Sequence, residues 1–175
     1  MREMIGRYRV TGLLGEGGMG VVYSAHDSQL DRAVAIKMIR AAEEDPLARD
    51  RLQREARSAA SVNHPSICQL YEIGEDAGEL FLAMELLQGE SLSTRLQRGP
   101  VPLGEAVATT LGILTGLDAL QRQGLVHRDL KPSNIFLTPH GIKLLDFGLA
   151  ISAAGGVATV TALRVTQPGT ILRTP

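Results

Sequence analysis

The sequence predicts an α+β fold with two lobes, a strand-rich lobe over residues 1–88 and a helical lobe over residues 89–175. Two observations predict it. Short apolar runs of strand length, separated by turn residues, recur from residue 8 to residue 85. After Gly89 the apolar residues recur at helical spacing, most clearly over 103–123. The change of pattern places the boundary between the lobes at this glycine.

The composition allows a packed domain and gives no sign of nucleic-acid or membrane partners. The chain has 175 residues, 44% of them hydrophobic, and a formal net charge of −1, which does not favour an anionic partner. The single cysteine, Cys68, excludes an intrachain disulfide and is typical of a reducing compartment. No apolar run reaches the length of a membrane span, and the N-terminus does not resemble a secretion signal. We therefore expect a cytoplasmic protein without a membrane segment.

The first motif is a glycine-rich turn between two expected strands. A strand is predicted over residues 8–14, and the strand formers Val21, Val22 and Tyr23 resume the pattern after the turn. The turn has the spacing G-x-G-x-x-G, and its residues include Gly15, Glu16, Gly17, Gly18 and Gly20. Because a strand follows, the pattern favours a lid whose glycines let the backbone approach a phosphate. An ordinary glycine-rich hairpin remains the alternative.

A charged residue interrupts the next expected strand. Residues 32–39 are apolar on both faces, which is typical of a buried central strand, yet they include Lys37. A buried ammonium group needs a partner of opposite charge. The alternative is that the lysine stem carries the charge to the edge of the sheet.

A carboxylate that suits Lys37 is expected on the helix predicted over residues 46–61. Glu55 and Ala59 share one face of this helix, so we expect the carboxylate to point inward and to form an ion pair with Lys37. The alternative is that Glu55 pairs locally with Arg51 on a solvated face.

Two more strands complete the first lobe. They are predicted over residues 68–75 and 80–85, joined by a turn at 76–78. Residues 85–87 then lead into Gly89, and we expect them to be the hinge between the lobes.

The second lobe begins with two helices, predicted over residues 92–98 and 103–123. The apolar residues of the longer helix cover a broad arc, so we expect it to be buried. Short strands are expected at 125–126, 135–137 and 142–145.

The most informative stretch is residues 127–134, His-Arg-Asp-Leu-Lys-Pro-Ser-Asn. The proline is incompatible with a helix interior, so these side chains are expected on a loop. The loop offers a carboxylate at Asp129, a cation at Lys131 and an amide at Asn134. Phosphoryl transfer needs such groups as base, charge neutraliser and metal ligand. A further carboxylate follows at Asp146, in an Asp-Phe-Gly sequence.

These motifs occur in one order along the chain: glycine turn, strand lysine, helix glutamate, His-Arg-Asp loop and Asp-Phe-Gly. Together they resemble the catalytic domain of eukaryotic-type protein kinases, from about Tyr8 to Pro175. The segment Lys131-Pro132-Ser133-Asn134 is similar to the serine/threonine branch, and the glycine turn is similar to that of bacterial members.

The resemblance implies a serine/threonine protein kinase that transfers the γ-phosphoryl group of ATP to a protein hydroxyl. Asp129 would accept the proton of the substrate hydroxyl, and Lys131 would neutralise the transferring group. Two Mg²⁺ ions would be held by Asn134 and Asp146. The implied nucleotide site is completed by Gly15, Glu16, Gly17, Gly18, Gly20, Val22, Ala35, Lys37, Glu55, Met84, Glu85, Leu87 and Phe136.

The sequence departs from the family after residue 150. The family's domain continues past its activation segment into an Ala-Pro-Glu motif and further helices that are missing here, so we expect a truncated domain with little activity of its own. Three interpretations stay open: a kinase that is catalytic in its complete form, a pseudokinase-like module that only binds ATP, and a truncation that does not fold stably. In this family, an arginine before the catalytic aspartate implies activation by phosphorylation, for which Thr166 and Thr170 are the first candidates.

Overall fold

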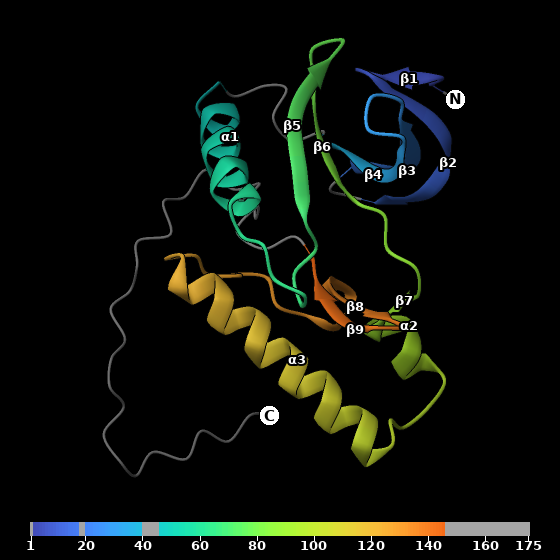
Figure 1. The fold of residues 1–175 in the computed structure, drawn as a ribbon, viewed down its shortest axis with the longest axis vertical. Coiled ribbons are helices and arrows are strands. Elements are labelled where there is room, and N and C mark those ends of the chain that lie inside the picture. Colours follow the sequence, from blue (N-terminus) through green and yellow to red (C-terminus); the bar gives the residue numbers. More distant parts are fainter. Residues whose placement is uncertain (1, 18–19, 40–45, 146–175) are drawn as a thin grey trace, which may run out of the picture.

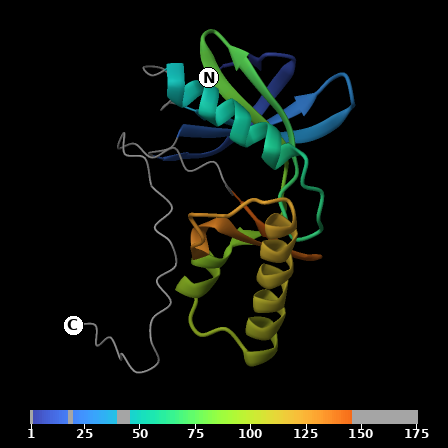
Figure 2. The ribbon, with the colours of Figure 1, turned by 90° about the vertical axis from the view of Figure 1, so that its left-hand side faces the viewer.

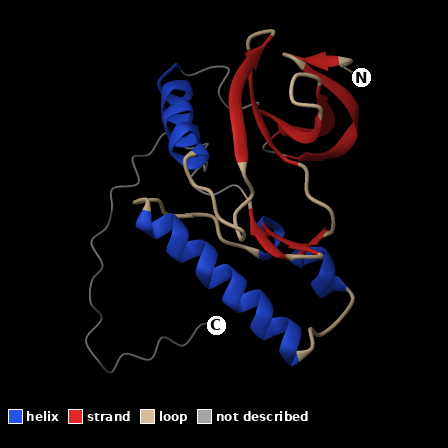
Figure 3. Cartoon of the chain, in the orientation of Figure 1, coloured by secondary structure: helices blue, strands red, loops and turns tan. Residues whose placement is uncertain are grey.

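The computed structural model describes residues 2–17, 20–39 and 46–145, which form two lobes stacked on one another (Figures 1 and 2). Strands fill the first lobe, and the long helix belongs to the second, as the colours of Figure 3 show. The predicted α+β architecture is confirmed. The predictions for Gly18, for Asp146 and for the segment after it lie outside the described residues.

The first lobe is a six-stranded antiparallel sheet in the order β1-β2-β3-β4-β6-β5. The strands are β1 (Met4–Ile5), β2 (Tyr8–Gly17), β3 (Gly20–Asp27), β4 (Arg32–Ile39), β5 (Leu70–Asp76) and β6 (Glu79–Glu85). Strand β4 has the predicted bounds. Strand β1 was not predicted, because two residues carry no periodicity.

One face of this sheet carries a core of its own. Successive side chains of a strand point to opposite faces, and Val34, Ile36 and Met38 of β4 all lie in this core. Tyr8 and Phe81 close it with their rings edge to face, 5.9 Å apart between centroids. The sheet lobe therefore buries this face with its own strands.

The opposite face packs on helix α1 (Pro46–Ala60) and on the second lobe. Ile39 and Leu82 lie on this face, and Ala56 and Ala59 meet them from the helix. The same cluster continues into the second lobe through Leu144. One apolar core therefore joins the two lobes behind the region where the site residues lie.

A polar network that the sequence did not reveal lies beside the first core. The hydroxyl of Tyr8 donates to Glu72 Oε2 at 2.6 Å, and Arg7 Nη2 lies 2.8 Å from the same carboxylate oxygen. Burial and this hydrogen bond raise the pKa of Tyr8. Asp27 is fully buried. Burial would raise the pKa of its carboxyl, but backbone N–H donors and Arg7 lower that pKa below its ordinary value.

In the second lobe, residues 89–145 form a three-stranded sheet, two helices and a 3-10 turn. The elements are β7 (Glu90–Ser91), α2 (Leu92–Gln97), α3 (Leu103–Arg122), the 3-10 turn Pro132–Asn134, β8 (Ile135–Thr138) and β9 (Gly141–Leu144). Helix α3 runs beneath the small sheet (Figure 1). Its small residues allow the contact, because a Cβ on Gly116 would lie 2.8 Å from the side chain of Leu144.

The prediction that α3 is buried is wrong for most of its surface. Only Thr109, Gly116 and Leu120 are buried, all on the face toward β9. The exposed large apolar residues of the helix are Leu103, Val107, Leu111 and Leu114. By length and composition α3 could also cross a membrane, which contradicts the expectation that no segment reaches that length. The face of α3 that carries Gly112 and Gly116 packs against β9, as a helix of a protein core does.

Two smaller predictions also need correction. Residues 125–126 are not a strand, and Val126 is 66% exposed. The loop at 127–134 is not wholly irregular, because Pro132 begins a 3-10 turn, a position where its missing N–H costs no hydrogen bond.

Candidate active site

Strand register brings four of the predicted nucleotide contacts onto one face of the sheet. Val22 of β3 and Leu82 of β6 flank Lys37 of β4, and Met84 of β6 lies opposite Ala35. Residues directly opposite each other on paired strands share a face. Val22, Ala35, Lys37 and Met84 therefore form a patch on the side of the sheet that faces α1 and the second lobe.

The glycine turn lies at the end of this patch and is a strand–turn–strand, as predicted. Gly15 is paired with Val22, Glu16 with Val21 and Gly17 with Gly20. A Cβ added to Gly15 would meet nothing within 4 Å, and Gly20 has a φ of +132° that favours glycine. The turn therefore leaves open space beside Gly15, which fits the close approach of a phosphate.

The loop at 127–134 is held by its own backbone. The Asp129 N–H donates to the carbonyl of His127 at 2.8 Å, and the Asn134 N–H donates to that of Lys131 at 2.9 Å. Arg128, between the first two, has a φ of +63°, which is uncommon for a residue with a side chain. His127 is 3% exposed, which suits a packing role. The tight backbone fixes the direction of the Asp129 side chain.

Three predicted catalytic and metal-binding side chains meet at Asp129. Lys131 Nζ lies 2.7 Å from Asp129 Oδ2, and Asn134 Nδ2 donates to the same oxygen at 3.0 Å. Asn134 Nδ2 also donates to the Asp129 carbonyl at 2.8 Å. The hydrogen bond from Lys131 is the main cause of a pKa of Asp129 below its ordinary value, with Asn134 second among the groups that lower it. The carboxylate is therefore held charged and in place.

The backbone also bonds Asn134 to the residue that precedes Asp146. The N–H of Leu145 donates to the carbonyl of Asn134 at 2.9 Å, and Asp146 is the next residue in the sequence. The side chain of Asp146 lies outside the described residues. The amide nitrogen of Asn134 is used by Asp129, so its amide oxygen is the atom that suits a hard cation such as Mg²⁺.

Glu55 has a partner that the sequence did not predict. Its Oε1 lies 3.3 Å from Nη1 of Arg128, and among the described residues no ion pair joins it to Lys37. The prediction of a Lys37–Glu55 pair is therefore not met in this structure. The carboxylate of Glu55 is instead held by the arginine of the catalytic loop. The side chain of Arg51 lies outside the described residues, so the local pair with Arg51 stays an open alternative.

The hinge passes very close to β8. Gly89 has a φ of +135°, and a Cβ there would overlap the carbonyl oxygen of Leu137. Phe136, one of the residues of the implied nucleotide site, is paired with Ser91 just after the hinge. Only glycine lets the hinge pass so close to β8. This close approach places Phe136 next to the segment that begins at Glu85.

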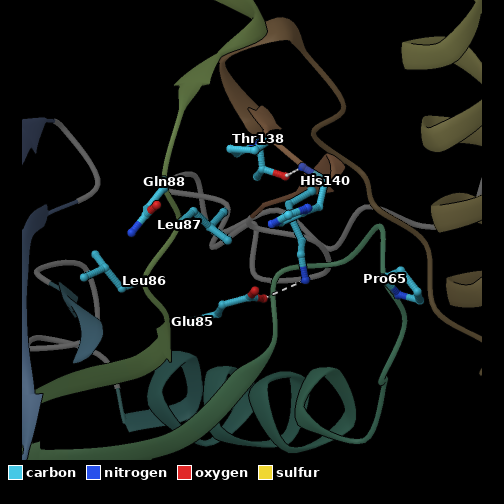
Figure 4. Close-up of a pocket in the computed structure, with 9 residues that line it drawn as sticks. Pro65, Glu85, Leu86, Leu87, Gln88, Thr138 and His140 are labelled. Carbon is cyan, nitrogen blue, oxygen red and sulfur yellow. Dashed lines mark hydrogen bonds and ion pairs between the residues drawn. The ribbon is translucent and has the colours of Figure 1, made fainter. Parts of the chain in front are cut away.

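A hollow of about 410 Å³ opens beside the hinge (Figure 4) and is lined by Pro65, Glu85, Leu86, Leu87, Gln88, Thr138, Pro139, His140 and Lys143. It shares Glu85 and Leu87 with the predicted nucleotide site. Its lining does not include Lys37 or Asp129. The hollow is therefore distinct from the cleft in which phosphoryl transfer would take place.

Comparison with known proteins agrees with this arrangement. The protein kinase domain family matches residues 8–168. A probable serine/threonine-protein kinase of Streptomyces coelicolor is 42% identical over 167 residues, covering 91% of this chain and 25% of its own. The serine/threonine-protein kinase PknL of Mycobacterium tuberculosis is 42% identical over 173 residues, covering 96% of this chain and 41% of its own.

The fold is similar to that of solved kinase domains. The crystal structure of the M. tuberculosis PknI kinase domain has a TM-score of 0.78 and 32% identity, covering 86% of this chain and 62% of that one. The chain thus spans less than half the length of these curated relatives and just under two thirds of the solved domain. The sequence match, the fold and the constellation around Asp129 agree. The chain belongs to the protein kinase family, in its bacterial serine/threonine-kinase branch.

Proposed function

We propose that the chain binds ATP with Mg²⁺ and, within an intact kinase, transfers the γ-phosphoryl group to a serine or threonine hydroxyl of a protein. One observation carries this proposal: Asp129 is clamped by Lys131 and Asn134 at 2.7 and 3.0 Å. A merely structural carboxylate would not need a cation and a potential metal ligand on the same oxygen.

The described residues fit a nucleotide. Adenine would lie between the sheet patch at Val22 and Ala35 and the second-lobe residue Phe136, with the backbone of Glu85 and Leu87 at its edge. The phosphates would extend toward the open space beside Gly15. Lys37 shares the sheet face of Ala35 and would hold them.

The chain's own groups divide the work of transfer. When bound, Mg²⁺ neutralises charge on the phosphates, and Asn134 and Asp146 would hold it. Asp129 would orient the substrate hydroxyl and accept its proton, which needs the ionised carboxylate that its low pKa maintains. Lys131 Nζ already lies at Asp129, so its charge would face the transferring group. Glu55 would leave Arg128 to orient Lys37.

Nucleotide binding is tested with Lys37→Met. The unchanged chain should show a higher thermal midpoint in ATP and Mg²⁺, because a ligand that binds only the folded state stabilises it. Lys37→Met should lose that shift. Arg57→Met, which changes an exposed cation on α1, is the matched control and should keep the shift. Equal responses of the Lys37 variant and the unchanged chain would contradict the assignment.

Transfer is tested in an intact kinase that contains this chain, with Asp129→Asn and a generic basic protein as phosphate acceptor. A general base typically contributes about 10²–10⁴-fold, so phosphate transfer should fall by that factor while ATP still binds. Asp118→Asn, on the exposed side of α3, should leave transfer unchanged. ATP binding without Asp129-dependent transfer would favour the pseudokinase-like interpretation instead.

A further inference from the structure

A charged side chain of the second lobe reaches the hinge. Lys143, on β9, places its Nζ 2.8 Å from Oε2 of Glu85 and 3.3 Å from the carbonyl of Ile67. The dashed line at Glu85 in Figure 4 marks this pair. The two side chains are 18% and 28% exposed, so both are largely shielded from solvent. The pair thus differs from an exposed surface ion pair, whose contribution is typically small.

The carboxylate of Glu85 also serves the segment that follows α1. The N–H of Gln69 donates to the same Oε2 at 3.3 Å, and the N–H of Glu85 donates to the carbonyl of Gln69 at 2.9 Å. The side-chain amide of Gln69 donates to the carbonyls of Ala60 and Leu70. Glu85, the first residue of the hinge, is therefore bonded to Gln69. Lys143 connects Glu85 to β9.

Strand β9 has a second attachment to the same segment. The Cys68 N–H donates to the Leu144 carbonyl at 3.0 Å, and the Leu144 N–H donates to the Ser66 carbonyl at 2.9 Å. These backbone bonds do not involve the hinge. Among the described contacts, the side chain of Lys143 is what links β9 to Glu85 itself. Removal of this side chain would leave the half-buried carboxylate of Glu85 without its cation.

The two ends of this link belong to different parts of the proposed nucleotide site. Glu85 begins the hinge whose backbone would bond adenine. Lys143 lies three residues before Asp146 in the sequence, and Leu145 between them is bonded to Asn134. The link therefore spans from the adenine side to the metal side of the site.

We propose that Lys143 is a positioning residue that, through Glu85, holds the hinge and β9, the strand that precedes Asp146 in the sequence, in the relation that ATP with Mg²⁺ requires. The inference rests on the proposed function and adds to it a residue that contacts neither nucleotide nor metal. Adenosine needs the hinge alone, whereas ATP with Mg²⁺ needs hinge and strand together. Loss of the link should therefore weaken the two ligands unequally.

The test is calorimetric titration of the 175-residue chain with adenosine and with ATP in Mg²⁺. Lys143→Met should weaken ATP·Mg²⁺ binding by about five-fold or more, the lower range of coupling between sites, and leave adenosine binding nearly unchanged. Glu85→Gln keeps the side-chain shape and the backbone groups that would bond adenine, so it should weaken ATP·Mg²⁺ binding likewise. The double variant should be no weaker than the worse single variant.

Two variants act as controls. His140→Ala changes an exposed residue that lines the same hollow and should leave both affinities unchanged. Lys143→Arg keeps a cation that can donate to Glu85 and should recover most of the ATP·Mg²⁺ affinity. If Lys143→Met loses its cooperative thermal transition, Glu85→Gln alone decides the outcome.

The possible outcomes distinguish failure of the Lys143 proposal from failure of the proposed function. Equal weakening of both ligands would show a merely structural role, and unchanged or tighter ATP·Mg²⁺ binding would show that the link does not position the site. Either result overturns the inference while the proposed function stands. Absence of ATP·Mg²⁺ binding by the unchanged chain would overturn both.

Discussion

The sheet lobe and helix α3 differ in how they bury their apolar residues. Ile36 and Leu82, on opposite faces of the sheet, are both 0% exposed. On α3, Leu103 is 80% and Leu111 57% exposed. Both elements have apolar sequences, so composition alone does not explain the contrast.

The difference lies in where the partners come from. A curled antiparallel sheet supplies its own neighbours, and the rings of Tyr8 and Phe81 close one face without a second lobe. A helix can bury only the face on which another element packs. For α3 that element is β9, which meets the small residues Gly112 and Gly116. Burial predicted from a pattern is therefore more secure for the sheet than for the helix.

The largest expected effect is on the core of the sheet lobe. Ile36→Ala should lower the free energy of unfolding by about 2–5 kcal/mol, because it removes buried methyl groups and leaves a cavity. Urea denaturation followed by circular dichroism measures the change. A loss below about 1 kcal/mol would show that the sheet core repacks easily. The sheet core would then not be the better packed of the two regions.

The next effect concerns the contact between α3 and β9. Gly116→Val should lower stability by about 1–3 kcal/mol, because its Cβ would lie 2.8 Å from Leu144 and 3.1 Å from the Ser66 carbonyl. Gly104→Ala is the control on the same helix, since its Cβ meets nothing within 4 Å. That change should be neutral or stabilising by up to about 1 kcal/mol. Similar losses for both would mean that helix propensity, and not the contact, decides.

A third prediction concerns Asp129 in the loop at residues 127–134. Nuclear magnetic resonance titration should give Asp129 a pKa below 3.8, its ordinary value, because Lys131 and Asn134 favour the carboxylate. Any stability from this group is therefore present above pH 3.8 and lost as the pH falls through the lowered pKa. Lys131→Met should return the midpoint toward 3.8. An unchanged midpoint in that variant would remove Lys131 as the cause.

The smallest expected effect on stability is on the exposed face of α3. Leu111→Glu should change the free energy of unfolding by less than about 0.5 kcal/mol, as is usual for surface positions. It should, however, reduce self-association at high concentration, because exposed apolar patches promote association. Sedimentation velocity measures this, with the exposed Ala108→Glu as control. A stability loss above about 1 kcal/mol would show that Leu111 is buried in solution.

Particular residues show which features of the fold and the site could be predicted from the sequence. The strands and the catalytic loop were predictable, because alternation and motif spacing are local. The partner of Glu55 was not, since the position of Arg128 depends on the loop backbone, where its φ is positive. The bond from Tyr8 to Glu72 joins residues 64 apart and belongs to no motif. The reach of Lys143 to the hinge was missed for the same reason.

The buried Tyr8 has an optical consequence. The chain has no tryptophan and three tyrosines, and Tyr8, Tyr23 and Tyr71 all lie on strands of the first lobe. Tyrosine fluorescence therefore reports on the sheet lobe, whereas far-ultraviolet circular dichroism sums the helices α1 and α3 and so includes the second lobe. A difference between the two melting curves would show, without any label, that the lobes unfold separately.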